Sequence, residues 1–433
     1  MQRSRHGRTT PSRWGDPKPG RAKQRAFMIA ALPQGEDLSE LSELLRTAGV
    51  GVVGQAVQHR DLPHPNTYLG PGKLEEVKVQ AQVADANVIA CDDELSPRQE
   101  RNLEKELGLP VVDRTTIILD IFAGHANSSE GKLQVELAQL EYNLARMRGL
   151  WTHLERLGGG IGTRGPGETQ IETDRRLARD RIAALKRRLS DVKSSRAVMR
   201  AERERAHLPQ VALAGYTNAG KSTLLNALTG AEVGVRDRLF HTLDPNTRAM
   251  RLNGRPYLLT DTVGFIRKLP HQLVDAFGAT LEETRLADLV LHVVDASVEE
   301  DEMVDMLRAV EDVLEEIGAG ERPRVLVLNK ADALDADRRD ELRFRHPDGV
   351  LVSALTGEGL DALRDRIAAE FRATLRPVDL LLPFEEGSRL AELHELAGDL
   401  QRTDTADGVR VRGRVPQTVA ERFARFAVPN GHA

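Results

Sequence analysis

The sequence has one cysteine, Cys91, and lacks any long hydrophobic run. A single thiol cannot close a disulfide within the chain, so a fold held together by internal disulfides is excluded. No segment comes near the ~20 apolar residues that a membrane-spanning helix needs, and we recognise no secretory leader. We therefore expect a cytoplasmic protein without a membrane span. Because Cys91 lies in the apolar run 88–91, we expect it to be a small core residue.

A large charge of one sign is also missing, since the formal net charge is only −5 over 433 residues. Two segments are strongly basic although the net charge is small. Residues 1–25 carry eight Arg and Lys against the single acid Asp16, which predicts a disordered basic tail over residues 1–26. Residues 174–205 form the second segment. A basic helix face is usually only a solvated face, but two such segments favour a nucleic-acid partner, because Lys and Arg contacts to phosphates dominate such binding.

Residues 27–130 alternate strand-like and helix-like runs, which indicates a small α/β domain with a mostly parallel sheet. A glycine turn at 68–73 superficially resembles a phosphate site but lacks the Gly-x-x-x-x-Gly-Lys spacing. We interpret it as a strand-to-helix loop, with RNA contact as the alternative, and no motif here supports a separate ATPase activity. The expected strands are 27–32, 51–58, 87–91 and 111–113, and the expected helices are 38–48, 72–84 and 97–106.

After residue 130 the apolar period becomes helical. Apolar residues recur three or four positions apart over 133–154 and again over 177–192, so we expect an antiparallel helical hairpin over 131–207, each helix burying the stripe of the other. Between the two rows, residues 158–168 are rich in glycine, which predicts a long flexible loop at the hairpin tip. This loop is either a plain linker or, because Arg164 stands among glycines that permit close approach, an RNA contact.

Residues 215–222 form a phosphate cradle in its required context, after the apolar strand 211–214 and before the helix-like run 223–228. The backbone N–H groups of such a loop and the N-terminal end of the helix bind phosphate oxygens. We expect Lys221 to reach the β- and γ-phosphates and the Ser222 hydroxyl to ligate magnesium. The expected nucleotide-binding residues of this loop are Gly215, Tyr216, Thr217, Asn218, Ala219, Gly220, Lys221 and Ser222.

A second motif identifies the base, because the buried-strand pattern 325–328 runs into Asn-Lys-x-Asp. The Asp332 carboxylate can accept hydrogen bonds from the ring N–H and the exocyclic amine of guanine. Adenine lacks this donor pair, so GTP is predicted over ATP. Asn329 would tie this loop to the phosphate loop, the Lys330 stem would cover one face of the base, and a backbone N–H of 353–355 would meet guanine O6. The expected base-binding residues are Asn329, Lys330, Ala331, Asp332, Ser353, Ala354 and Leu355.

Two segments between these motifs are expected to sense the γ-phosphate. The Asp261 carboxylate would hold the magnesium shell, and the Gly264 N–H would bond the γ-phosphate. Thr242 is the expected second hydroxyl on magnesium, with Thr247 as the alternative, and both segments would become ordered around GTP. The expected nucleotide contacts are Phe240, His241, Thr242, Leu243, Asp244, Asp261, Thr262, Val263 and Gly264. The expected metal ligands are Ser222 and Thr242, and the expected catalytic residues are Lys221, Thr242, Asp261 and Gly264.

The glutamine that orients the attacking water in Ras-like enzymes is missing, because Phe265 follows Gly264. Phenylalanine cannot hold a water molecule. One interpretation is that Phe265 packs a switch helix together with Ile266 and Leu269. We favour another hypothesis, in which unaided hydrolysis is slow and a partner completes or reorganises the site.

The helix-like run 360–375 closes a GTPase domain that we expect over 208–376, and Arg376-Pro377 marks its boundary. Residues 377–433 are predicted to form a small α/β domain, with a strand at 378–382, a helix at 386–396 and a two-faced strand at 409–415. Arginines line one side of that last strand. This row is equally consistent with rRNA binding and with an ordinary solvated strand face.

Together these motifs resemble the HflX family, the ribosome-associated GTPases of bacteria within the Obg-HflX-like P-loop GTPases. The resemblance covers about residues 27–430 and implies an α/β fold. A P-loop GTPase domain with a parallel sheet would be preceded by a small α/β domain and an antiparallel helical hairpin, and followed by a small α/β C-terminal domain. The motifs that carry it are residues 92–97, 112–115, 119–123, 132–140, the glycine-rich tip, 215–222 and 261–266.

The resemblance also implies a function. Members bind GTP or GDP with Mg²⁺, dock on the large (50S) ribosomal subunit and its rRNA, and split or rescue stalled or idle ribosomes under stress, with hydrolysis stimulated by the ribosome. The alternative is a GTP-dependent ribosome-assembly or RNA-modification accessory factor that does not separate subunits. We expect a monomer. The basic tail and His241, which replaces a smaller residue, depart from the family pattern.

Overall fold

A computed structural model gives the structure of the chain. It describes residues 24–33, 37–60, 62–147, 166–205, 208–231, 239–240, 242–252, 254–268, 270, 273 and 278–428. The chain forms two compact units, residues 1–189 with 270–276 and residues 190–269 with 277–433. The predicted basic tail lies outside the described residues apart from its end, where Arg25 and Ala26 already belong to the first strand. Among the described residues no helix is both long and apolar enough to cross a membrane.

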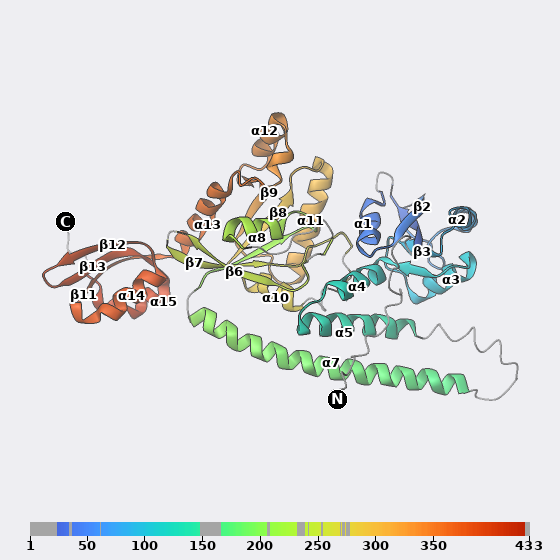
Figure 1. The fold of residues 1–433 in the computed structure, drawn as a ribbon, viewed down its shortest axis with the longest axis horizontal. Coiled ribbons are helices and arrows are strands. Elements are labelled where there is room, and N and C mark those ends of the chain that lie inside the picture. Colours follow the sequence, from blue (N-terminus) through green and yellow to red (C-terminus); the bar gives the residue numbers. More distant parts are fainter. Residues whose placement is uncertain are drawn as a thin grey trace, which may run out of the picture. The chain divides into compact units, whose positions relative to one another are not determined.

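The N-terminal sheet has four parallel strands in the order β2-β1-β3-β4 (Figure 1). Their bounds are β1 Arg25–Leu32, β2 Gly51–His59, β3 Val88–Cys91 and β4 Val111–Asp113, and the helices are α1 Ser39–Thr47, α2 Pro71–Val83, α3 Pro97–Leu107 and α4 Arg114–His125. Cys91 is fully buried in the core of this sheet, which confirms its predicted place. The sequence analysis missed α4. Its apolar residues are buried on several sides of the helix. They therefore lack the spacing of three or four residues that marks a helix buried on one face.

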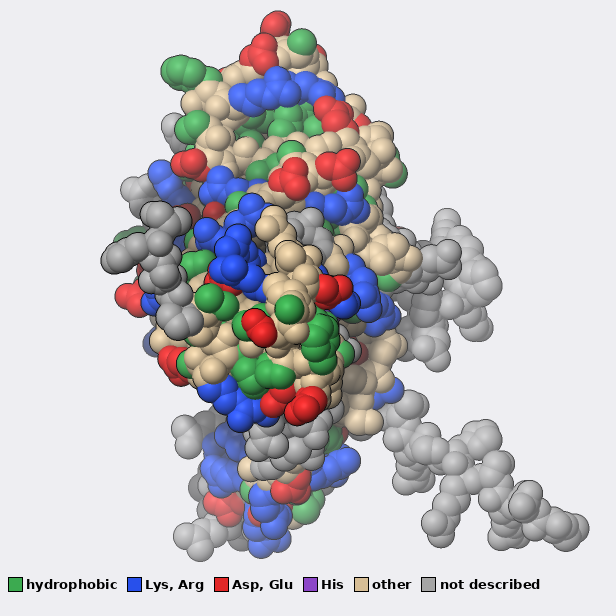
Figure 2. Space-filling view, turned by 90° about the vertical axis from the view of Figure 1, so that its left-hand side faces the viewer, with side chains coloured by type: hydrophobic (Ala, Val, Ile, Leu, Met, Phe, Trp, Pro, Cys, Tyr) green, Lys and Arg blue, Asp and Glu red, His purple; other side chains and the backbone are tan. Residues whose placement is uncertain are grey.

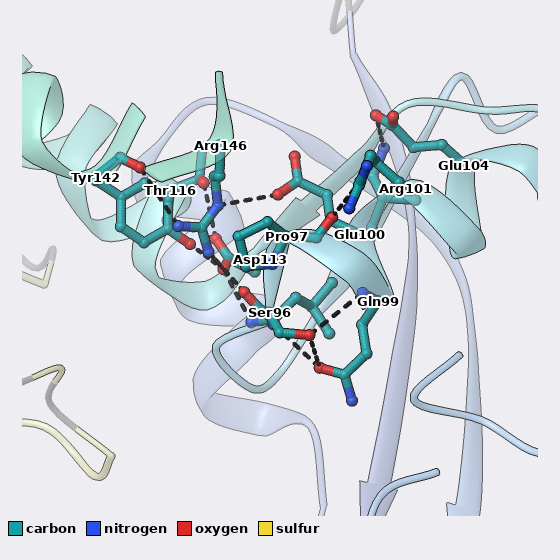
Figure 3. Close-up of polar contacts among 12 residues, drawn as sticks. Ser96, Pro97, Gln99, Glu100, Arg101, Glu104, Asp113, Thr116, Tyr142 and Arg146 are labelled. Carbon is teal, nitrogen blue, oxygen red and sulfur yellow. Dashed lines mark hydrogen bonds and ion pairs between the residues drawn. The ribbon is translucent and has the colours of Figure 1, made fainter. Parts of the chain in front are cut away.

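Asp113 at the end of β4 attaches the next helix, α5 Ser129–Arg146, to this sheet (Figure 3). Its Oδ1 accepts hydrogen bonds from the N–H and the hydroxyl of Thr116, at 2.9 and 2.7 Å, and so caps the start of α4. Its Oδ2 accepts from the Leu95 N–H at 3.0 Å, from Arg146 Nη2 at 3.2 Å and from the Tyr142 hydroxyl. Because Tyr142 and Arg146 both belong to α5, one carboxylate joins β4, α4 and α5.

The helix α7, Pro166–Arg205, packs against α5 and forms the expected hairpin. Leu133 of α5 and Leu185 and Leu189 of α7 are buried together, as the apolar rows predict, but Leu177 is 59% exposed. Two ion pairs, Arg181–Glu136 and Lys186–Glu141, also join the helices. Within the predicted tip loop, residues 166–168 are helical, because Pro166 begins α7, and residues 158–165 lie outside the described residues.

The second unit contains a six-stranded sheet in the order β10-β9-β8-β5-β7-β6, in which β6 alone is antiparallel to its neighbour (Figure 1). Its strands are β5 Gln210–Gly215, β6 Asn246–Leu252, β7 Arg255–Asp261, β8 Leu289–Asp295, β9 Arg324–Asn329 and β10 Val350–Leu351. Its helices are α8 Lys221–Thr229, α10 Gly278–Leu286, α11 Glu300–Glu316, α12 Ala336–Arg345 and α13 Leu360–Thr374. The buried strand residues pack against α8 and α13, as expected for a parallel sheet covered by helices.

A three-stranded antiparallel sheet follows in the same unit, in the order β11-β13-β12. Its strands are β11 Arg376–Leu382, β12 Gly398–Thr405 and β13 Gly408–Val415, and its helices are α14 Gly387–Leu396 and α15 Gln417–Arg422. The strand β12, whose residues are mostly polar, was not predicted. Asp379 of β11 pairs with Arg410 and Arg412 of β13, so part of the arginine row is neutralised. In Figure 2, basic side chains form separate groups with acidic and apolar side chains between them.

Candidate nucleotide-binding site

The predicted nucleotide residues that the structure describes meet at one edge of the six-stranded sheet. The parallel strands β5, β7, β9 and β10 all point their carboxyl ends to this edge. The phosphate loop follows β5, the Asp-x-x-Gly segment follows β7, and the two base-recognition loops follow β9 and β10. Ligands of open parallel α/β sheets bind at this position, outside the carboxyl ends of the strands. The fold therefore brings together four motifs that lie up to about 140 positions apart in the sequence.

The backbone conformation of the phosphate loop requires a glycine at position 220. Gly220 has φ +89° and precedes Lys221, the first residue of α8. A Cβ atom at Gly220 would lie 2.3 Å from Asn329 Nδ2, which is too close for any side chain. That Nδ2 donates to Ala219 O at 2.8 Å, so Asn329 ties the base loop to the phosphate loop, the contact that the sequence predicted.

Lys221 is buried under the phosphate loop. Its Nζ donates to Gly215 O at 3.0 Å and to Tyr216 O at 2.8 Å. Burial lowers the pKa of Lys221 to about 8, while the nearby Asp261 carboxylate acts in the opposite direction. The ammonium group is therefore held by loop carbonyls at the place where the sequence expects it to meet phosphate oxygens.

Three oxygen-bearing side chains from three segments meet beside Lys221. Ser222 Oγ lies 2.9 Å from Thr242 Oγ1, and both hydroxyls donate to Asp261 Oδ2, at 2.6 and 3.0 Å respectively. The alternative residue, Thr247, instead lies with its Oγ1 2.9 Å from Thr260 Oγ1, between β6 and β7. Two hydroxyls and a carboxylate are hard oxygen donors, which fit magnesium with its remaining positions filled by water and phosphate. Ser222 and Thr242 could therefore hold the metal, with Asp261 acting through its water shell.

The Asp-x-x-Gly segment is attached to the phosphate loop by backbone hydrogen bonds. The Phe265 N–H donates to Gly215 O at 3.1 Å, and the Thr217 N–H donates to Phe265 O at 2.7 Å. The Arg267 N–H donates to the Tyr216 hydroxyl at 2.8 Å. A Cβ at Gly264 would lie 2.7 Å from Thr217 Cγ2, so position 264 accommodates only glycine.

The side chain of Phe265 is fully buried, as is that of Ile266. This burial agrees with the packing interpretation, while Leu269 lies outside the described residues. A buried ring cannot position water, so Phe265 itself does not replace the missing glutamine.

The other predicted phosphate-sensing residues differ in how their side chains lie. Phe240 and Leu243 are buried, so they could contact a nucleotide only through their backbone. Asp244 is half-buried, and His241 lies outside the described residues. Thr262 and Val263 are buried; the Thr262 hydroxyl donates to Leu213 O at 2.7 Å and fixes this segment to β5.

The base-recognition loops are bonded to each other. Ser353 Oγ donates to Asp332 Oδ1 at 2.5 Å, which orients the carboxylate that the sequence assigns to guanine. The Ala354 N–H donates to Asn329 Oδ1 at 3.0 Å, and the Ser353 N–H donates to Glu358 O at 2.9 Å. Two of the three backbone N–H groups at 353–355 therefore have partners, so among the three the N–H of the exposed Leu355 is the candidate for guanine O6. Ala331 is buried, and its N–H donates to Val352 O at 3.0 Å.

Sequence reasoning missed several contacts that support this site. Lys330 Nζ donates to Asp295 Oδ2 at 2.6 Å, so the lysine stem is fixed from the end of β8. Arg339 of α12 contacts both base-recognition loops. The Tyr216 hydroxyl reaches the Arg267 N–H. Asp295 directly follows an apolar strand, which is a usable signal, but nothing local to Arg339 or Tyr216 indicates a partner far away in the sequence.

Comparison with known proteins bears on this site. Residues 35–123, 125–203 and 210–330 match family models described as GTP-binding GTPase N-terminal, GTP-binding GTPase Middle Region and 50S ribosome-binding GTPase, respectively. The chain is 47% identical over 413 residues to GTPase HflX of Lacrimispora saccharolytica, covering 94% of this chain and 96% of that protein. It is 45% identical over 383 residues to GTPase HflX of Escherichia coli, covering 87% and 89%.

A search of solved structures gives a more distant likeness. The crystal structure of a GTP-binding protein from the archaeon Sulfolobus solfataricus in complex with GDP is 28% identical to this chain, with a TM-score of 0.41. The matched part covers 80% of this chain and 98% of that chain.

Proposed function

The chain belongs to the HflX family of GTPases, and we propose that it is a GTP-controlled switch that binds the large ribosomal subunit and splits or rescues stalled or idle ribosomes. Its identity to GTPase HflX proteins over most of the chain supports hydrolysis of GTP to GDP and phosphate. The observation that carries the switch is the meeting of Ser222, Thr242 and Asp261. These residues come from the phosphate loop and both γ-phosphate-sensing segments, so one bound nucleotide would contact all three.

Each part of the site has a proposed task. The backbone N–H groups of the phosphate loop hold the phosphates, and Lys221 exchanges its two carbonyl partners for the β- and γ-phosphate oxygens. Magnesium, when bound at Ser222 and Thr242, neutralises phosphate charge. Asp332, oriented by Ser353, accepts from the guanine ring N–H and amine. Gly264 lies against Thr217 of the phosphate loop, and we assign its N–H to the γ-phosphate.

Slow unaided hydrolysis follows from Phe265, whose buried ring takes the place of a water-orienting glutamine. We expect the ribosome to supply or reorganise the missing group. Single-turnover rates with and without 50S subunits test this step. A ribosome-independent rate as fast as that of the stimulated enzyme would contradict it.

Support for an RNA-rich partner comes from the description of the matched family as 50S ribosome-binding and from the charge of α7. Residues 172–192 contain seven basic and four acidic residues, most of them exposed. Two of the basic residues are used in ion pairs to α5, whereas Arg176, Arg179 and Arg188 have no ion pair within the described part of the chain. Exposed arginines of this kind suit contacts with rRNA phosphates.

Sedimentation of purified 70S ribosomes distinguishes the two proposed functions. With the protein and GTP or a non-hydrolysable analogue, we expect 70S particles to separate into subunits, and with GDP to remain intact. The Lys221→Ala variant serves as a control because it removes the phosphate-binding ammonium. Unchanged 70S particles in every nucleotide state, with retained 50S binding, would instead favour the assembly or RNA-modification accessory factor.

A further inference from the structure

The loop that carries Ser353 and Leu355 is weakly held by the sheet. It follows β10, an edge strand of two residues whose one partner among the described strands is β9, through Val350–Val327 and Leu351–Leu328. Neither the short strand nor its edge position fixes the direction in which the following loop points. The start of the 353–359 loop is joined to the Asn-Lys-x-Asp loop by the hydrogen bonds from the Ala354 N–H to Asn329 Oδ1 at 3.0 Å and from Ser353 Oγ to Asp332 Oδ1 at 2.5 Å. The far end of the loop, around Glu358, needs an attachment of its own if the loop is to keep facing the same base as Asp332.

Arg339 on α12 supplies that attachment. Its guanidinium forms two parallel hydrogen bonds with Glu358, Nη1 to Oε1 at 2.6 Å and Nη2 to Oε2 at 3.2 Å. The same Nη2 donates to Ala331 O at 2.6 Å, and Nε donates to Leu334 O at 3.3 Å. One planar group thus contacts both the Asn-Lys-x-Asp loop and the 353–359 loop.

The Arg339–Glu358 contact is connected through hydrogen bonds to the residues that would recognise the base. Glu358 O accepts from the Ser353 N–H at 2.9 Å, and the Ser353 hydroxyl donates to Asp332. Displacement of Glu358 would therefore shift Ser353, and with it the orientation of the Asp332 carboxylate.

We infer that Arg339 is a positioning residue for guanine recognition, acting through Glu358 to hold the two base-recognition loops in register. This inference rests on the proposed assignment of those loops to the base. The guanidinium bonds to Glu358 and to the Ala331 and Leu334 carbonyls, not to the groups assigned to the base. A bidentate arginine–carboxylate pair fixes relative orientation, which a lysine, with a single charged nitrogen, cannot reproduce.

The solvent exposure of the Arg339–Glu358 pair determines whether its removal affects global stability or only the base-recognition loops. The side chains of Arg339 and Glu358 are 24% and 46% exposed, and pairs at that exposure contribute little to global stability. The consequence of losing the pair should then be local, at Asp332 and Leu355. Inosine lacks the exocyclic amine of guanine, so it has one donor fewer for the Asp332 carboxylate. A misplaced carboxylate therefore weakens the binding of GDP more than the binding of inosine diphosphate.

The test measures the Kd of GDP and of inosine diphosphate for the full chain and for Arg339→Ala, Arg339→Lys and Glu358→Ala. We expect Arg339→Ala to raise the Kd of GDP about tenfold, a loss equivalent to one charge-assisted hydrogen bond. The same substitution should reduce the preference for GDP over inosine diphosphate. Arg339→Lys should restore only part of this preference. The double variant Arg339→Ala/Glu358→Ala should be no worse than Arg339→Ala, because Arg339 acts through Glu358.

Arg343→Ala is the matched control, because Arg343 lies on the same helix and pairs with Asp340 on the solvent side. It should leave both affinities unchanged. Unchanged affinities in Arg339→Ala, or equal weakening of both nucleotides together with a lowered Tm, would overturn the positioning role. A wild-type chain that binds inosine diphosphate as tightly as GDP would instead show that the base assignment itself fails.

Discussion

At the scale of the residue, Lys221 shows how the fold prepares a group for its ligand. Its ammonium is buried with two carbonyl oxygens as hydrogen-bond partners. Carbonyl dipoles compensate a positive charge less well than phosphate anions do, which is why burial can lower the pKa of Lys221 to about 8. The free site is therefore electrostatically incomplete, and an anionic phosphate would complete it.

This lowered pKa predicts a pH dependence of nucleotide affinity. The free protein loses the Lys221 charge as pH rises through about 8, whereas bound phosphates favour the charged form and raise the pKa. GDP binding should therefore take up a proton near pH 9, and its Kd should rise by up to tenfold per pH unit above about pH 8. Calorimetry in two buffers of different ionisation enthalpy measures this uptake. A Kd that is constant from pH 7.5 to 9.5 would contradict the prediction, and binding at pH 7 without proton uptake is the control.

At the scale of the element, α5 is held to the N-terminal sheet by polar contacts as well as by apolar packing. Tyr142 and Arg146 lie one helical turn apart and reach the same carboxylate, Asp113, while Arg146 also pairs with Glu100 at 2.9 Å (Figure 3). Burial raises the pKa of Tyr142 far above its ordinary value, so its hydroxyl stays protonated and donates. A buried carboxylate that loses such a donor is costly to the folded state.

The Tyr142→Phe substitution tests this attachment, because it removes one hydroxyl and keeps the ring. We expect a loss of about 1–3 kcal/mol in the local free energy of unfolding, the usual cost of a buried hydrogen bond to a charged group. Hydrogen exchange of peptides from α4 and α5 would show the loss of protection. Tyr257→Phe in the six-stranded sheet is the control and should leave those peptides unchanged. Equal protection in wild type and Tyr142→Phe would contradict the role of this hydroxyl.

At the scale of the whole molecule, the charge distribution matters more than its sum. A chain with a formal net charge of −5 is repelled on average by RNA, so any attraction must come from local basic surfaces. The arginines of β13 are partly neutralised by Asp379, whose pKa the Arg410 guanidinium holds at about 2. On α7, by contrast, Arg179 and Arg188 are exposed and have no ion pair in the described part of the chain.

Charge reversal on α7 should therefore weaken binding to 50S subunits. For Arg179→Glu/Arg188→Glu we expect a smaller dependence of the binding constant on salt, with the logarithmic slope reduced by about 0.7–0.9 for each lost phosphate contact. Co-sedimentation with 50S subunits at several salt concentrations measures this slope. The control, Arg308→Glu/Arg343→Glu, makes the same change in net charge on α11 and α12. An equal effect of both variants would show that only the total charge matters.

Periodicity and local motifs predicted much of the fold, and their failures have identifiable causes. The fold class is confirmed, and the expected strands and helices of 27–107 lie within a few residues of their predicted bounds. The buried helix α4 escaped detection because its buried residues lie on several sides of the helix, and β12 because it is an edge strand with mostly polar residues. The assigned nucleotide residues meet at one sheet edge, while their individual roles remain proposals.

The sequence by itself predicted a guanine-nucleotide site, because the phosphate loop and Asn-Lys-x-Asp are short motifs made of residues that are adjacent in the sequence. It also determined the parallel sheets, through apolar runs separated by helix-like segments. Only the tertiary structure brought Thr242 rather than Thr247 next to Ser222, joined Asp113 to Tyr142, and placed Arg339 on Glu358. Such contacts join side chains distant in the sequence, and their geometry depends on how whole elements pack, which no local pattern records.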